Sequence, residues 1–366
     1  MIIRHPQRLP LLALGMIALL TGLWAGLMRL GWDIPPLQPI LPAVHGPLMI
    51  SGFLGTLIGL ERAVALGRRW AYASPLLSGL GGLGLIAGFQ GSGAPVLILA
   101  GSLGLVAIFA VIIRLRPALY TVTMGLGAAC WVAGNLLWLW GWPIAHFVFW
   151  WAGFLLLTIA GERQELARLQ QLSPGSQASF LLTLASVLMG LIVIGFSFDI
   201  GVRLVGAGMV GLALWLGRHD IARRTVRQTG ITRFIAVCLL SGYVWLGLSG
   251  LLAVVFGGVS AGPQYDAMLH AFFLGFVFAM IFGHAPIIFP AVLGARMAFR
   301  PMFYAHAILL QVTLVLRLAG DLIGWGAGRQ VGGLLNVLAL LFFLANTVYA
   351  LRSPVKDAAT VKAGAS

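Results

Sequence analysis

The sequence predicts an all-α, polytopic membrane protein of about twelve transmembrane helices. Of its 366 residues, 60% are hydrophobic and only 9% are charged, whereas about a quarter of the residues in soluble proteins are charged. The mean hydropathy is +1.00, and apolar runs long enough to cross a bilayer recur along the chain. The net charge of +14 comes from basic residues in short loops between these runs, so we expect a lipid bilayer and not nucleic acid as the partner. Cys130 and Cys238 lie in apolar runs and form neither a disulfide framework nor a CxxC pair.

Windows of about twenty apolar residues divide the chain into twelve candidate spans. Their ranges are 10–30, 43–66, 71–90, 95–114, 118–140, 143–161, 177–197, 199–217, 231–256, 264–292, 301–324 and 330–351. The third, fourth and eighth are rich in Gly, which allows membrane helices to approach one another closely. The first is long enough to stay in the membrane as a helix instead of being cleaved as a signal peptide. We therefore expect one transmembrane domain over residues 1–352 and a short polar cytoplasmic tail over residues 353–366.

The positions of Lys and Arg predict the orientation of the chain. If both termini are cytoplasmic, 19 of the 23 basic residues fall at cytoplasmic ends and loops, in keeping with the positive-inside rule. The other four are Arg29, Arg203 and Arg329 on the outer side and Arg317 within a span. This bias favours an even number of spans in a cell inner membrane. The 19 residues are Arg4, Arg8, Arg62, Arg68, Arg69, Arg114, Arg116, Arg163, Arg168, Arg218, Arg223, Arg224, Arg227, Arg233, Arg296, Arg300, Arg352, Lys356 and Lys362.

A weak internal repeat divides the chain further. In the second span His45 precedes a Glu-Arg pair at 61–62, and in the sixth span His146 precedes a Glu-Arg pair at 162–163, with the same sixteen-residue interval from His to Glu. The tenth span begins in the same way with His270, and each histidine follows a proline in the outer loop. Because spans two, six and ten are four apart, the chain can be divided into three four-helix units. The Glu-Arg pairs are expected to form ion pairs at the cytoplasmic surface.

The three histidines enter the membrane at equivalent places on the outer side. A neutral imidazole is a good ligand for haem iron or copper. The alternative is that each histidine is an interfacial residue bonded to a loop carbonyl. Three histidines at matching positions favour ligation by at least two of them, and we expect His45 and His270 to be the axial pair.

Span eleven carries a polar stripe. His306, Thr313 and Arg317 are spaced seven and four residues apart, so they share one face of a helix, and Asp321 lies one turn further on. Arg317 is expected at the level of the three histidines, where its guanidinium would suit a haem propionate. The alternative is an internal pair between Arg317 and Asp321. His306 lies near the inner end and is either a structural residue or a further metal ligand.

A further histidine, His284, lies near the inner end of span ten. It follows His270 by fourteen residues, which places both on nearly the same face of a regular helix. Pro286 and Pro290 follow it and are expected to kink or unwind the helix. His284 is either a packed histidine or a group that lines a proton or ion path or a second ligand site.

Several of these residues resemble those of the NnrS family, membrane proteins related to subunit I of the haem-copper oxidases. The likeness lies in His270-Ala271 at the start of span ten, in a Gly-containing apolar helix followed by a short basic loop, and in Arg317-Leu318-Ala319. The stretch HGPLMISGF from His45 to Phe53 is similar to the family's second-helix motif, although it has one histidine where the family commonly has a pair.

The resemblance implies a fold of twelve helices in three four-helix units and a haem site. In the oxidase superfamily a low-spin haem is held by histidines of the second and tenth helices, which are here His45 and His270. A copper-site histidine comes from the sixth helix and is here His146. Span seven has no histidine, span six lacks the His-to-Tyr spacing of oxidases, and span ten lacks two histidines one residue apart. We therefore do not expect a complete haem–copper centre that reduces oxygen.

These observations together predict an inner-membrane protein that binds haem b, with copper as a further candidate cofactor. The resemblance links it to nitric oxide and nitrosative stress tolerance, or to a respiratory redox step with a redox donor, and leaves open whether it is an enzyme. The alternative is a secondary transporter or permease without haem, because twelve spans, Gly-rich helices and the prolines of span ten also suit a transporter. A third function class is an assembly subunit of a respiratory complex without a cofactor of its own.

Overall fold

The computed structural model describes residues 4–35, 37–167, 172–295 and 297–352. Within these ranges the chain forms helices and no strands, which confirms the all-α prediction. Eleven helices in the described ranges are long and apolar enough to cross a membrane. Large apolar side chains on the outside of the bundle, such as Leu182, Leu214 and Val244, are exposed, as expected for a surface that contacts lipid. The predicted tail at 353–366 lies outside the described residues, as do Arg168, Arg296, Lys356 and Lys362.

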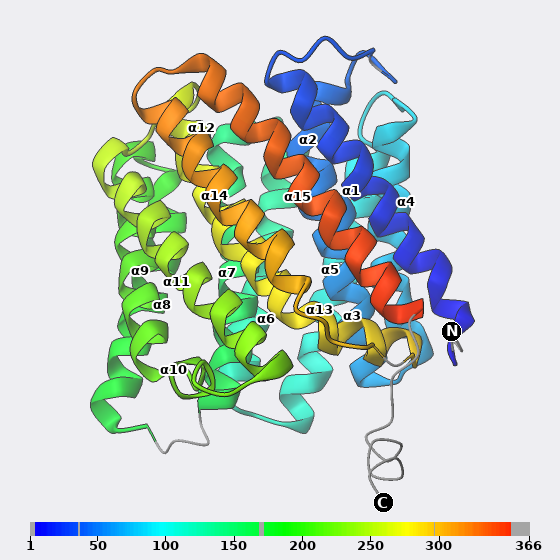
Figure 1. The fold of residues 1–366 in the computed structure, drawn as a ribbon, viewed down its shortest axis with the longest axis vertical. Coiled ribbons are helices and arrows are strands. Elements are labelled where there is room, and N and C mark those ends of the chain that lie inside the picture. Colours follow the sequence, from blue (N-terminus) through cyan, green and yellow to red (C-terminus); the bar gives the residue numbers. More distant parts are fainter. Residues whose placement is uncertain (1–3, 36, 168–171, 296, 353–366) are drawn as a thin grey trace, which may run out of the picture.

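All twelve predicted spans coincide with helices (Figure 1). The first six contain η1 (Pro6–Arg8), α1 (Leu9–Arg29), η2 (Leu41–Val44), α2 (His45–Pro47), η3 (Leu48–Gly55), α3 (Thr56–Leu66), η4 (Arg69–Tyr72), α4 (Ala73–Ile86), α5 (Gly93–Leu115), α6 (Leu119–Leu139) and α7 (Ile144–Ala167). The last six contain α8 (Pro174–Ile194), α9 (Phe198–His219), α10 (Ala222–Thr225), α11 (Gly230–Phe256), α12 (Pro263–His270), η6 (Ala271–Val277), α13 (Phe278–Leu293), α14 (Phe303–Leu322) and α15 (Gly326–Arg352).

Helix α4 is the short member of the bundle. Its 14 residues span about 21 Å, less than the thickness of a bilayer core. It nevertheless runs alongside the second span for its whole length, because small residues let the two backbones approach. Near its start Gly59 faces Pro75, and further along a β-carbon at Gly82 would lie 3.2 Å from the α-carbon of Gly52. The Gly-rich third span is therefore a closely packed helix and not a loop.

The three helical segments that carry the predicted repeat form the centre of the bundle. Of their membrane-crossing windows, 67% is buried in 41–66, 78% in 144–166 and 72% in 263–293, compared with 33–56% in the other eight. The other three helices of each four-helix unit surround these central segments. Contacts of α5 with α6, of α9 with α11 and of α15 with α1 join each group to the next and close the ring.

Two of the central helices contain π-helical segments, and both segments follow a predicted site histidine. Segment η3 begins three residues after His45, and η6 begins directly after His270. A π-helix bonds residue i to i+5, and such segments are rare and concentrated at functional sites. Within η3, the carbonyl oxygen of Ser51 accepts a hydrogen bond from the hydroxyl of Ser78 of α4 at 2.7 Å.

The segment η6 lies between His270 and His284, so the fourteen-residue spacing no longer places them on one face as in a regular helix. Of the two effects expected from the prolines of span ten, a kink or an unwound helix, unwinding does not occur. Helix α13 continues through Pro286 and Pro290 and ends at Leu293, where Gly294 adopts a left-handed conformation with φ of 66°.

The two ends of the bundle differ. Helix α1 begins and α15 ends at the same end, where α10 also lies with Arg223 and Arg224 (Figure 1). We call this the basic end. The opposite end, where α12 lies, is called the cavity end.

Candidate functional site

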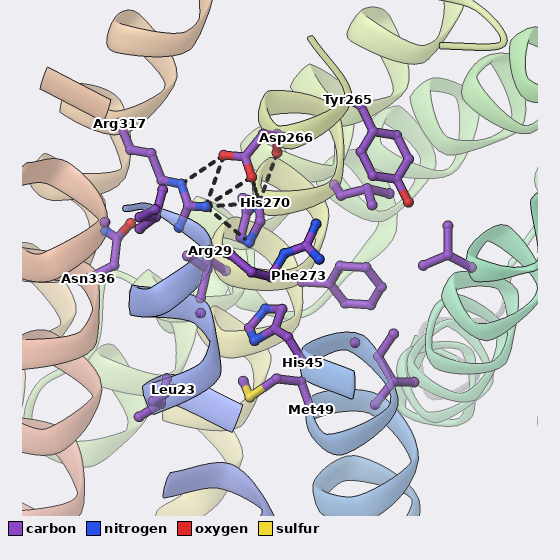
Figure 2. Close-up of a pocket in the computed structure, with 18 of the residues that line it drawn as sticks. Leu23, Arg29, His45, Met49, Tyr265, Asp266, His270, Phe273, Arg317 and Asn336 are labelled. Carbon is purple, nitrogen blue, oxygen red and sulfur yellow. Dashed lines mark hydrogen bonds and ion pairs between the residues drawn. The ribbon is translucent and has the colours of Figure 1, made fainter. Parts of the chain in front are cut away.

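A cavity of about 320 Å³ lies at the cavity end of the central helices (Figure 2). Its deep walls are apolar and include Leu54, Leu274 and Phe278. Its polar side chains come from α1, α2, α12, α14 and α15 and include His45, His270, Asp266, Arg29, Arg317, Arg329 and Asn336. An apolar cavity with a few convergent polar groups is the usual form of a ligand site.

His45 and His270 face each other across this cavity. Their ring centroids are 6.4 Å apart and their planes are inclined by 24°. Nδ1 of His45 lies 2.7 Å from the carbonyl oxygen of Gly22, and Nδ1 of His270 lies 2.9 Å from the carbonyl oxygen of Asp266. A carbonyl oxygen only accepts, so each Nδ1 carries a proton, and in a neutral imidazole the lone pair is then on Nε2. Metal-ligating histidines are oriented in this way by a bond from the other ring nitrogen.

Asp266 is a site residue that the sequence reasoning missed. Its carboxylate binds Arg317 through a bidentate ion pair with Nε–Oδ2 at 3.0 Å and Nη2–Oδ1 at 3.1 Å. The Arg317 side chain, 8% exposed, is therefore held by an acid of the tenth span, and Nη2 also lies 3.3 Å from Nε2 of His270. The signal in the sequence was an acidic residue four positions before His270, on the same helix face.

The alternative pairing of Arg317 with Asp321 is not formed in the described chain. Asp321 instead lies 2.9 Å from Arg329, measured from Oδ1 to Nε, and Nη2 of Arg329 lies 3.8 Å from Oδ1 of Asp266. We call Asp266, Arg317, Asp321 and Arg329 the upper ion-pair cluster. It joins α12, α14 and α15 beside the cavity.

Arg29 adds a further positive charge at the rim. Its Nη1 donates to the carbonyl oxygen of Pro42 at 3.3 Å, and among the described residues no carboxylate lies within ion-pair distance. Arg29 and Arg329 are two of the three arginines that break the positive-inside pattern, and both line the cavity. Their position on the outer side, against the positive-inside rule, was the feature of the sequence that could have identified them as site residues.

The other three predicted histidines lie elsewhere. His146 does not line the cavity, although Ile144, Ala145 and Val148 on the same helix do; its ring centroid lies 4.1 Å from that of Phe198 on α9. Nδ1 of His146 is buried without a hydrogen-bond partner. The structure therefore brings together His45 and His270 and separates His146 from them.

His284 and His306 lie nearer the basic end. Nδ1 of His284 is 2.7 Å from the carbonyl oxygen of Met280. His306 is fully buried among aromatic rings, with the ring of Phe282 at 4.8 Å and the amide of Asn346 at 3.2 Å from Nδ1. In the part of the chain that the structure describes, no group of three His, Cys, Asp or Glu side chains is arranged to hold a metal ion.

The repeated Glu-Arg pairs form a second polar network near the basic end. Arg62 contacts Glu61 at 3.2 Å and also pairs with Glu162, so the carboxylates of both repeats meet at one guanidinium. Arg163 instead lies 3.8 Å from Asp220, which accepts a hydrogen bond from the hydroxyl of Tyr243 at 2.7 Å. Of the two expected pairs, Glu61 with Arg62 is present, whereas in the described chain Glu162 pairs with Arg62 instead of Arg163 and so joins the first four-helix group to the second.

The fold and the cavity define a polytopic, all-α membrane protein with a histidine–arginine site among its central helices. The chain belongs to the family described as a domain of unknown function, DUF8744, whose family model matches residues 8–352. The match spans every helix from α1 to α15. A search of curated proteins found no match.

Proposed function

We propose that this protein binds haem b in the cavity, with His45 and His270 as axial ligands. The observation that carries the proposal is the facing pair of imidazoles, each with its Nδ1 bonded to a carbonyl oxygen. The two residues come from the second and tenth spans, as the resemblance to the NnrS family implies.

The residues around the pair fit the group. Leu54, Leu274 and Phe278 supply an apolar wall for a porphyrin, and Arg29 and Arg317 supply guanidinium groups for its propionates. Nη2 of Arg317 lies 3.3 Å from Nε2 of His270 here, so ligation of iron would require Nη2 to turn away from this nitrogen while Nε keeps its bond to Asp266. Haem held by His45 and His270 would supply one-electron transfer.

Glycine makes the room that His45 requires. A β-carbon at Gly26 would lie 3.0 Å from Cε1 of the imidazole. The side chain of Arg29, one turn further along α1, lies at the rim of the same cavity. Helix α1 therefore supplies the acceptor for Nδ1, the space for the ring and a charge for an anionic ligand.

The wider role that we propose is tolerance to nitric oxide and nitrosative stress, or a step of respiratory electron transfer with a redox donor. This part rests on the resemblance to the NnrS family. Copper is not included, because the ring of His146 lies against Phe198 and not at the cavity.

We further propose that the protein lies in a cell inner membrane with the basic end and both termini in the cytoplasm. The support is the distribution of Lys and Arg along the sequence. A fluorescent protein that folds only in the cytoplasm should be bright at the C-terminus. An alkaline phosphatase fusion that is active at the same place would contradict the orientation.

The test of haem binding is the reduced-minus-oxidised spectrum of the purified protein. We expect Soret and α bands in the wild type and their loss in His45→Ala and in His270→Ala. His146→Ala is the matched control and should keep both bands. A wild-type protein that stays colourless when expressed with added haem would sink the proposal.

The transporter alternative is favoured by one feature of the same cavity. Phe278 lines its apolar wall, and the ring of Phe278 stacks on that of Phe53 with centroids 6.2 Å apart, an aromatic pair that could act as a gate. A colourless protein that takes up a solute, and loses uptake in Arg317→Gln, would support this function instead.

A further inference from the structure

We propose that Asp266 is the positioning residue of this site: it fixes the His270 imidazole, holds Arg317 beside it and sets the electron donation of His270. The inference rests on the proposed haem binding and adds a residue that tunes the ligand. Figure 2 shows Asp266 between Arg317 and His270, with dashed lines to both.

One residue makes all of these contacts. Oδ1 of Asp266 lies 3.2 Å from Nδ1 of His270, and its carbonyl oxygen lies 2.9 Å from the same nitrogen. The same carboxylate holds Arg317 through Nε at 3.0 Å and Nη2 at 2.9 Å. A change at Asp266 therefore reaches both the imidazole and the guanidinium.

The two facing histidines differ in this respect. Nδ1 of His45 bonds to the neutral carbonyl of Gly22, whereas Nδ1 of His270 has a carboxylate as well as a carbonyl within reach. A carboxylate attracts the ring proton more strongly than a carbonyl does and raises the basicity of the other nitrogen. His270 is therefore the stronger donor of the pair.

The upper ion-pair cluster holds two acidic and two basic side chains. Asp266 and Asp321 are matched by Arg317 and Arg329, and the side chains of Asp266 and Arg317 are only 15% and 8% exposed. Charges act strongly on one another at such partly buried positions. Neutralising Asp266 weakens donation by His270 and leaves Arg317 without its partner. Both changes favour the ferrous form, which carries one positive charge fewer.

The test compares the midpoint potentials of the wild type and Asp266→Asn by spectroelectrochemical titration. We expect the ratio of ferrous to ferric affinity to rise about tenfold, a positive shift of about 59 mV for a one-electron couple. Asp199→Asn is the matched control, because Asp199 pairs with Arg203 at an exposed position away from the cavity. Asp266→Glu keeps the charge and should return most of the shift.

A second variant separates tuning from damage to the fold. Arg317→Gln removes the positive charge and frees the carboxylate to act on His270, so its potential should move in the negative direction. A merely structural role would move both variants the same way. If Asp266→Asn does not retain haem, the sign of the Arg317→Gln shift decides, and no shift or a positive one overturns the inference.

The two proposals fail in different ways. A colourless wild-type protein would overturn the proposal of haem binding itself. A wild type that binds haem through His45 and His270, with Asp266→Asn at the potential of Asp199→Asn, removes only the role of Asp266.

Discussion

Gly26 of α1 lies directly against the imidazole of His45, with an added β-carbon 3.0 Å from Cε1 and 3.3 Å from Nδ1. Such a contact is too close for a methyl group, so the ring must move away. The bond from Nδ1 to Gly22 leaves little freedom for that movement. The glycine is thus part of the site through the space it leaves.

We predict that Gly26→Ala weakens haem retention about tenfold, the lower end of the range for changes in the shell around a ligand. Retention is measured as the Soret absorbance that survives gel filtration with apomyoglobin as acceptor. Gly15→Ala on the same helix is the control, since its β-carbon would meet Phe53 and Thr56 at 3.6 to 3.7 Å, an ordinary contact. Equal retention by the two variants would contradict the prediction.

Arg62→Gln should destabilise the fold without changing the haem spectrum. The substitution leaves Glu61 and Glu162 without their shared cation, and the loss at such partly buried positions should cost about 1–3 kcal/mol, between the values for exposed and for buried pairs. The measurement is thermal unfolding in detergent, followed by tryptophan fluorescence. Arg203→Gln, at a pair whose side chains are 43% and 54% exposed, should unfold at the wild-type temperature. A lower unfolding temperature for both variants would mean that burial does not matter here.

Gly55→Ala is expected to disturb the packing of η3. Its β-carbon would overlap Cζ2 of Trp131, a buried ring whose Nε1 donates to the hydroxyl of Ser51. Overpacking a core costs about 1–3 kcal/mol. Gly46→Ala is the control, because no atom lies within 4 Å of its β-carbon. Unfolding in a denaturant series should separate the two variants, and equal midpoints would argue against close packing at Trp131.

The two cysteines should be unreactive in the folded protein. Cys130 and Cys238 are free thiols with 3% and 2% of their surface exposed. Burial excludes thiol reagents from both sites. A maleimide of defined mass should add to neither in mild detergent and to both in SDS, as measured by mass spectrometry. Labelling of the folded protein at either residue would show that its helix opens.

The sequence predicted the helices and singled out three of them through the repeat. Apolar runs and their length define spans because each helix satisfies its own backbone in lipid. The repeat marked spans two, six and ten, which are the most buried of the helices that can cross a membrane. Facing histidines at 45 and 270 could be proposed because equivalent positions on central helices lie at similar depth.

The periodicity of the sequence could not predict which residues of different helices contact each other. Spacing relates residues within one helix, so it suggested Arg317 with Asp321, whereas Asp266 of another helix supplies the partner. The same limit hid the meeting of Glu162 with Arg62. His146 matches the repeat in position, yet the rotation of its helix turns the ring towards Phe198. No local pattern in the sequence reports that rotation.

The number of residues in the π-helical segment η6 sets the direction in which His270 points relative to the rest of the tenth span. A helix absorbs the loss of one residue by rotating everything before it by about 100° relative to everything after it. A deletion within Ala271–Val277 would let ordinary helical bonding continue, and the span would still be long enough for the membrane. His270 would nevertheless turn away from His45. This stretch should therefore tolerate exchanges of apolar side chains far better than the loss of a single residue.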